Sequence, residues 1–121
     1  MSYMFRFNDS SIDLSPLENW NVSKVKNFSL MFDTTGISDI SALENWDVSS
    51  ANDMSYMFNS TNLTDISSLA NWDVSNVTNM NYIFADTSIS DISALENWDL
   101  SNLKVMSGLF AGTSISDISI L

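Results

Sequence analysis

The sequence predicts a repeat solenoid of the α/β class, in which right-handed coils of 26 residues each carry a short parallel β-strand and a short helix. Three observations support this prediction. Tryptophan recurs at a constant interval, as Trp20, Trp46, Trp72 and Trp98. The residues between the tryptophans align from one interval to the next, and self-similarity at a fixed period is typical of solenoids. A chain of 121 residues, 45% of them hydrophobic, can bury one core, so we expect a single domain.

The repeats account for the whole chain, 1–121. A partial repeat covers 1–19, full repeats cover 20–45, 46–71 and 72–97, and a truncated repeat covers 98–121. Residues 1–5 are identical to residues 54–58, so the chain starts within a repeat, and it also stops within one. Solenoids normally need polar capping units, and neither end has one. We therefore expect a fragment of a longer array, or ends that associate with another molecule.

The segment after each tryptophan predicts a short helix. In the third full repeat, Val77, Met80, Ile83 and Phe84 have the i, i+3, i+6, i+7 spacing of one helix face. Ser75 precedes this face and is a suitable N-cap residue. The equivalent positions are apolar in every repeat, so we interpret them as core and not as a ligand site.

The rest of each repeat predicts a strand and a tight arc. Trp72 and Val74 are two residues apart, so in a strand both face the core and Asp73 faces out. In the arc 89–97, apolar residues recur every three positions, which favours a 3₁₀-like conformation. An asparagine precedes every tryptophan. We expect it to bond the backbone of the neighbouring coil, because a bend must satisfy its polar groups.

Composition excludes several classes of function. The chain has four basic and fifteen acidic residues, with a formal net charge of −11. It therefore lacks the cationic surface that nucleic acids and anionic membranes attract. It contains no histidine and no cysteine, which removes the usual zinc ligands and the usual general base of a catalytic triad. We expect no enzyme activity. The sequence shows neither a signal peptide nor a membrane-spanning run, so we expect targeting and anchoring segments to lie outside this chain.

The repeat resembles a known family. The pattern Trp-Asp-Val-Ser-Asn-Val-Thr-Asn-Met-x-Tyr-Met/Ile-Phe, followed by Ile-Ser-Asp-Ile-Ser-x-Leu-x-Asn, closely resembles the BspA-like leucine-rich repeats of bacterial surface proteins, also described as the Mycoplasma-type lipoprotein repeat. The Ile-Ser-Asp-Ile-Ser-x-Leu arc is also similar to that of internalin-type repeats. The resemblance implies a leucine-rich-repeat-like solenoid, extracellular and displayed on a bacterial cell, that binds a host or neighbouring-cell protein or glycan without catalysis.

Two columns of equivalent residues are candidate binding surfaces. Asp47, Asp73 and Asp99 stack on the outer face of the predicted sheet, where like charges in register repel one another. A basic partner, hydration or a bound Ca²⁺ relieves this repulsion, and Ca²⁺ is the least favoured because no calcium-loop pattern is present. We therefore expect no cofactor. Tyr3, Tyr56 and Tyr82 lie on the flank of the predicted helix, where exposed aromatic residues favour contact with protein or sugar. The alternative is that they are partly buried against the adjacent coil.

Two further columns suggest weaker hypotheses. The aspartates of the arc, with Asp65 as an example, satisfy backbone groups of a turn. The threonines that follow the phenylalanines, such as Thr87, form a row that in principle orders water as ice-binding surfaces do. The preferred function is recognition at the cell surface. The alternatives are a structural spacer within a larger surface protein and end-to-end self-association through unpaired sheet edges.

Overall fold

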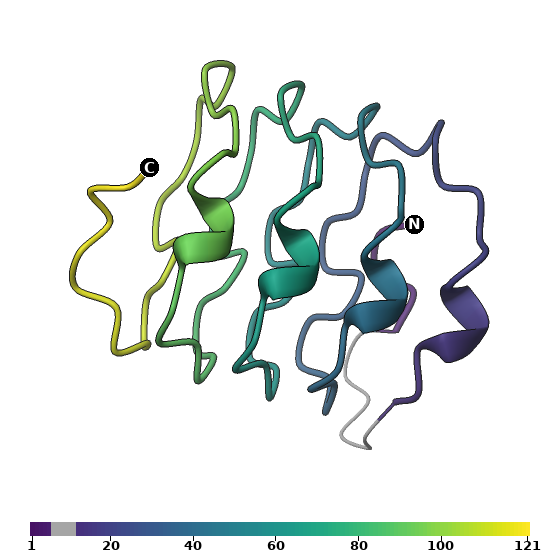
Figure 1. Cartoon of the computed structure of the whole chain (residues 1–121), viewed down its shortest axis with the longest axis horizontal. Coiled ribbons are helices and arrows are strands. Elements are labelled where there is room, and N and C mark those ends of the chain that lie inside the picture. The colour runs from purple at the N-terminus through teal and green to yellow at the C-terminus, as the bar shows by residue number, and fades with distance from the viewer. Residues whose placement is uncertain (6–11) are drawn as a thin grey trace.

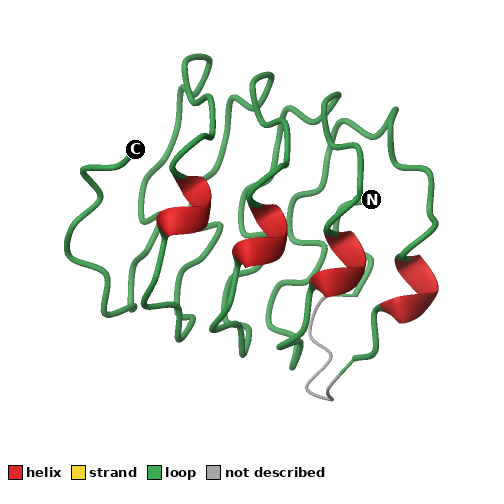
Figure 2. Cartoon of the chain, viewed as in Figure 1, coloured by secondary structure: helices red, strands yellow, loops and turns green. Residues whose placement is uncertain are grey.

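The computed structural model describes residues 1–5 and 12–121 and shows a stack of coils running from the N-terminus to the C-terminus (Figure 1). Each repeat forms one turn of the chain, and equivalent segments of successive repeats lie side by side. The predicted repeat solenoid is therefore confirmed. Short 3₁₀ helices line up along one side of the stack (Figure 2), and they are η1 (Ser15–Leu17), η2 (Ser41–Leu43), η3 (Ser67–Leu69) and η4 (Ser93–Leu95).

The 3₁₀ helices occupy the arc in which apolar residues recur every three positions, as predicted. In η2 the N–H of Leu43 donates to the carbonyl of Ile40 at 2.9 Å, and the N–H of Glu44 donates to that of Ser41 at 3.2 Å. Both are i→i+3 bonds, and a helix with three residues per turn keeps Ile40 and Leu43 on one face. That face is buried, so the arc closes the coil over the core.

The prediction of a short helix after each tryptophan is wrong. This segment instead forms isolated parallel bridges, which join Asn27 to Asp53, Asp53 to Asn79 and Asn79 to Val105. The backbone N–H of Tyr56 donates to the carbonyl of Asn81 in the next coil at 2.8 Å. A helix would direct such N–H groups along its own axis, whereas here alternate groups bond the adjacent coil.

Stacked turns explain the helix-like spacing of this segment. The N–H of Met57 donates to the carbonyl of Met54 at 3.2 Å, and Tyr56 between them has a φ of 56°. A positive φ at the third residue is the requirement of a type II turn. Two columns of residues adopt this left-handed conformation: Tyr3, Leu30, Tyr56, Tyr82 and Gly108 form the first, and Thr34, Ser60, Asp86 and Gly112 form the second. Because successive left-handed positions are four residues apart, the turns bury apolar residues at helix-like spacing, so the pattern placed the core positions correctly but assigned them to the wrong structure.

The strand predicted at the tryptophan is also absent from the described residues. Trp72 and Val74 are buried and Asp73 is exposed, as predicted, but the N–H of Val77 donates to the carbonyl of Val74 and turns the chain. The Trp72 indole N–H donates to the carbonyl of Leu43 in the preceding coil at 2.9 Å. Trp46 and Trp98 make the equivalent bonds.

Columns of identical side chains fill the core. The rings of Phe32, Phe58, Phe84 and Phe110 stack one on another, with centroids 5.8, 5.9 and 5.8 Å apart. The first three are fully buried, and methionine, isoleucine and leucine columns pack around them. The asparagine before each tryptophan is exposed and makes no bond to a neighbouring coil in the described structure, so that expectation is wrong. The tryptophan indole makes that bond instead.

We predict that Thr34→Gly stabilises the fold. Thr34 has a φ of 55°, and a left-handed conformation costs a non-glycine residue about 1–2 kcal/mol. The greater flexibility of glycine in the unfolded chain offsets about 0.5–1 kcal/mol of this gain. Denaturant unfolding should therefore show a net gain of about 0.5–1 kcal/mol.

The matched control is Thr64→Gly, at an exposed position that does not have a positive φ. This change should destabilise the protein by about 0.5–1 kcal/mol. Equal losses in the two variants would contradict the stacked-turn geometry.

Candidate recognition surface

Asx turns hold the first predicted column in place. The Oδ1 atom of Asp73 accepts hydrogen bonds from the N–H of Ser75 at 3.0 Å and from its hydroxyl at 2.6 Å. Asp47 bonds Ser49 in the same way, and Asp99 accepts from the N–H of Ser101. These carboxylates are exposed, so they face solvent as predicted. They cap local turns, however, and do not project from a strand. The serine that was predicted to cap a helix is the donor of this turn.

The capping bonds also favour the ionised form of two of these carboxylates, those of Asp47 and Asp99. The hydroxyl of Ser49 and its backbone N–H lower the pKa of Asp47, and Ser101 has the same effect on the pKa of Asp99. Hydrogen bonds to the charged form of an acid favour that form. Within the described residues, no group of three or more acidic, histidine or cysteine side chains is placed to hold a metal ion. The geometry therefore offers no support for the calcium alternative.

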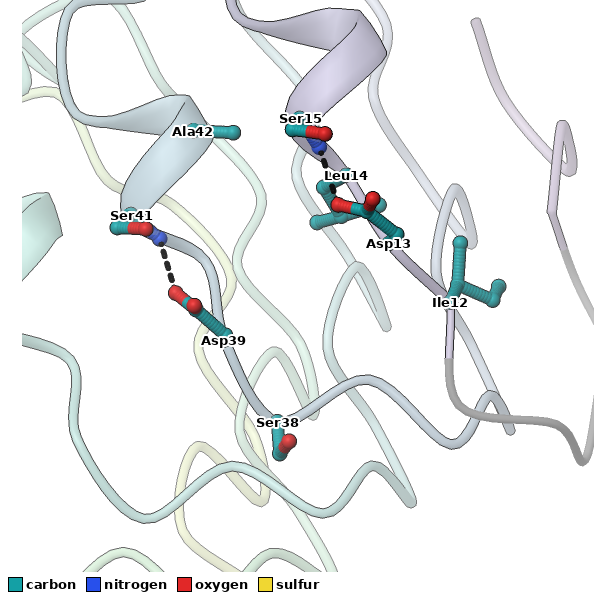
Figure 3. Close-up of a pocket in the computed structure, with 8 residues that line it drawn as sticks. All are labelled: Ile12, Asp13, Leu14, Ser15, Ser38, Asp39, Ser41 and Ala42. Carbon is teal, nitrogen blue, oxygen red and sulfur yellow. Dashed lines mark hydrogen bonds between the residues drawn. The ribbon is translucent and has the colours of Figure 1, made fainter.

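Grooves separate neighbouring coils along the 3₁₀ side. One groove of about 300 Å³ is lined by Asp13 and Ser15 of one coil and by Asp39, Ser41 and Ala42 of the next (Figure 3). In both coils the aspartate accepts a hydrogen bond from the backbone N–H of the serine two residues later, at 2.9 Å. The expected role of these aspartates in satisfying turn backbone is therefore confirmed.

The same groove recurs two coils further along. It has a volume of about 360 Å³ and is lined by Asp65, Ser67, Asp91 and Ala94. The backbone N–H of the serine lowers the pKa of each arc aspartate, and the five are Asp13, Asp39, Asp65, Asp91 and Asp117. The grooves thus present ionised carboxylates and serine hydroxyls, without a histidine or cysteine to act as base or nucleophile.

The tyrosines form a second surface, on the stacked turns. The rings of Tyr56 and Tyr82 are stacked, with centroids 5.1 Å apart and planes inclined by 14°. Both side chains are half-buried, and each residue has a positive φ. The next position of the column is Gly108, where an added Cβ would clash with the Tyr82 ring. The tyrosine stack therefore ends against the backbone of the last coil.

The threonine column does not form an exposed row. Thr35, Thr61 and Thr87 are buried, and each hydroxyl donates to the carbonyl of the phenylalanine three residues earlier. The distances are 2.7, 2.8 and 2.8 Å. An ice-binding surface built on these residues is therefore excluded.

Two structural roles were missed by the sequence analysis. Asn27, Asp53 and Asn79 cap a third turn in the three coils that contain them, since each accepts a hydrogen bond from the N–H two residues later. The side-chain amide of Asn76 donates to the carbonyl of Ser49 in the preceding coil at 2.8 Å. The turns had a visible signal, because in each full repeat the Asx residue of all three turns is followed two residues later by serine or asparagine.

Comparison with known proteins identifies the family. Residues 1–120 match the family described as "Mycoplasma protein of unknown function, DUF285", and the chain belongs to this family. No curated protein matches the sequence. Internalin C2 from Listeria monocytogenes has a similar structure, with 29% sequence identity and a TM-score of 0.61. The match covers 90% of this chain and 41% of that protein. An internalin (inlF) from the same organism matches at 26% identity and a TM-score of 0.48, over 94% of this chain and 42% of its own.

These findings confirm the resemblance to BspA-like and internalin-type leucine-rich repeats. The chain spans less than half the length of the internalins that it matches. Among the described residues, no helix has both the length and the apolar character needed to span a membrane.

We predict that acid weakens the fold through the capping aspartates. The folded-state pKa of Asp65 lies below its ordinary value, so its ionised form stabilises the fold above the unfolded pKa of about 3.9. This stability is lost as the pH falls through the folded pKa. Thermal unfolding should therefore show a falling midpoint below about pH 4.

Asp65→Asn is the informative variant, because its amide oxygen still accepts the Ser67 N–H bond but does not ionise. It should lose less stability than the wild type between neutral and acidic pH. An identical pH profile for the two proteins would show that this carboxylate does not contribute.

Proposed function

We propose that this chain is a non-catalytic recognition module of a bacterial surface protein, which binds a protein or glycan of a host or neighbouring cell through a repeated face of the solenoid. Family membership and the structural similarity to internalin C2 support the general class. The family's function is described as unknown, so the binding face is argued from this chain's own residues.

The observation that carries the proposal is the pair of tyrosines in left-handed turns. This conformation costs a non-glycine residue about 1–2 kcal/mol, and stacking of the two rings returns about 0.5–1.5 kcal/mol. In the last coil Gly108 adopts the same conformation, with a φ of 63°. The turn therefore does not require tyrosine, and the fold gains little net stability from Tyr56 and Tyr82. Residues that are held in strained conformations and add little stability to the fold are candidates for a functional role.

The chemistry of tyrosine supports the same conclusion. Tyrosine is enriched among the residues that dominate binding energy at protein interfaces, because it combines a large apolar ring with a polar tip. Within the described chain, neither the Tyr56 nor the Tyr82 hydroxyl has an intramolecular hydrogen-bond partner. Both hydroxyls are thus available to a partner. Asp47, Asp73 and Asp99 form a second proposed contact row, exposed on another segment of each coil.

The test is binding of the purified chain to arrays of extracellular-matrix proteins and glycans. We predict that Tyr82→Gly weakens binding of a captured partner by about 2 kcal/mol or more. The same change should alter the free energy of unfolding by less than about 1 kcal/mol, because relief of backbone strain offsets the lost stacking.

Thr64→Ala, at an exposed position on a different segment, is the control and should leave binding unchanged. Asp73→Lys tests the second contact row separately. An absence of binding to every protein and glycan in the arrays would contradict the proposal and favour a spacer role.

A further inference from the structure

Both faces of the Tyr82 ring are covered by neighbouring coils, whereas its edge is not stacked. One face of Tyr82 lies against the ring of Tyr56, at 5.1 Å between centroids. On its other side the ring lies against the backbone of Gly108, so closely that a Cβ there would clash. Stacking on one side and backbone on the other leave the ring edge and the hydroxyl as the parts that a partner can reach.

This arrangement bears on the choice between protein and glycan. A sugar ring that docks on an aromatic residue needs an open ring face, as any stacking interaction does. The covered faces of Tyr82 do not offer one. A protein partner can instead hydrogen-bond the hydroxyl and pack against the edge, as at ordinary protein interfaces.

The negative charge near the tyrosines further restricts the class of protein that can bind here. The stretches that carry the two tyrosines, 50–62 and 76–88, contain two acidic residues, Asp53 and Asp86, and no lysine or arginine. Asp53 lies three residues before Tyr56, and Asp86 lies four residues after Tyr82. Asp86 is exposed, and its carboxylate lies against Gly112, where an added Cβ would clash with it. Complementary potentials across an interface increase association rates and select partners.

We infer that the partner at this face is a cationic protein segment, whose arginine or lysine side chain pairs with Asp86 while its polar groups meet the Tyr56 and Tyr82 hydroxyls. The inference rests on the proposed recognition function and specifies the class of its partner. Arginine suits such a site because its planar group bonds carboxylates in a bidentate manner and packs on aromatic side chains.

To test this inference, the isotope-labelled full chain is titrated with four probes, and its amide signals are monitored by NMR. The probes are an arginine–glycine repeat peptide, its glutamate–glycine counterpart, a neutral glucose oligosaccharide and an N-acetylglucosamine oligosaccharide. We expect only the arginine peptide to shift the amide signals of residues 55–60 and 81–86, with an affinity that falls as salt rises.

Two substitutions locate the contact. Tyr82→Phe keeps the stacked ring and removes only the hydroxyl, and it should weaken peptide binding about threefold to tenfold. Asp86→Asn removes one charge at a left-handed position that asparagine tolerates, and it should weaken binding by a similar factor. Asp91→Asn makes the same charge change on the arc and should leave the affinity nearly unchanged.

The outcomes separate this inference from the proposed function. Signal shifts at 55–60 and 81–86 caused by an oligosaccharide alone would overturn the cationic partner and keep recognition at this face. Equal losses from Asp86→Asn and Asp91→Asn, with no effect of Tyr82→Phe, would show general charge attraction and overturn the specific site. No shift with any probe, together with no binding in the protein and glycan arrays, would contradict both.

Discussion

Hydrogen bonding between adjacent coils is the constraint on which the whole structure depends. Alternate backbone N–H groups of each stacked-turn segment donate to carbonyls one repeat later, as Phe58 does to Ile83 at 3.0 Å. The bond requires the donor and acceptor segments to lie side by side in successive coils, which fixes the register between each pair of neighbouring coils. The constant interval between tryptophans in the sequence follows from this requirement. The phenylalanine stack and the indole bonds follow from the same register.

This constraint also explains the unusual backbone of the stacked turns. A turn can present N–H groups to its neighbour at alternate positions only if some residues take a left-handed conformation. The chain accepts leucine, threonine and tyrosine at these positions because the bonds to both neighbouring coils fix the geometry. The type of side chain at such a position can therefore vary without a change in the backbone conformation. Gly108 and the two tyrosines adopt the same backbone conformation, so the turn does not dictate which side chain it carries.

The repeat, the inward-facing positions and the 3₁₀ arc were predicted correctly from the sequence, because these features depend only on periodicity. Val77, Met80 and Ile83 were placed in the core correctly for that reason. The helix and strand assignments were wrong because a spacing of three or four residues fits stacked turns as well as a helix. Tyr56 and Tyr82 were identified as surface candidates, but their stacking and the covering role of Gly108 depend on contacts between coils. Such contacts between coils cannot be predicted from the spacing of residues within one repeat.

The indole bond has a consequence for how such proteins change length. Trp46, Trp72 and Trp98 each donate to a leucine carbonyl 29 residues earlier, so each indole bond joins its coil to the one directly before it. A duplicated unit such as 46–71 would find its acceptor in the preceding copy and supply one to the next. Its interfaces would match those already present, since repeat proteins are held together by nearest-neighbour contacts. Unequal recombination within such a gene could thus lengthen or shorten the array in whole coils, without creating a new core to optimise.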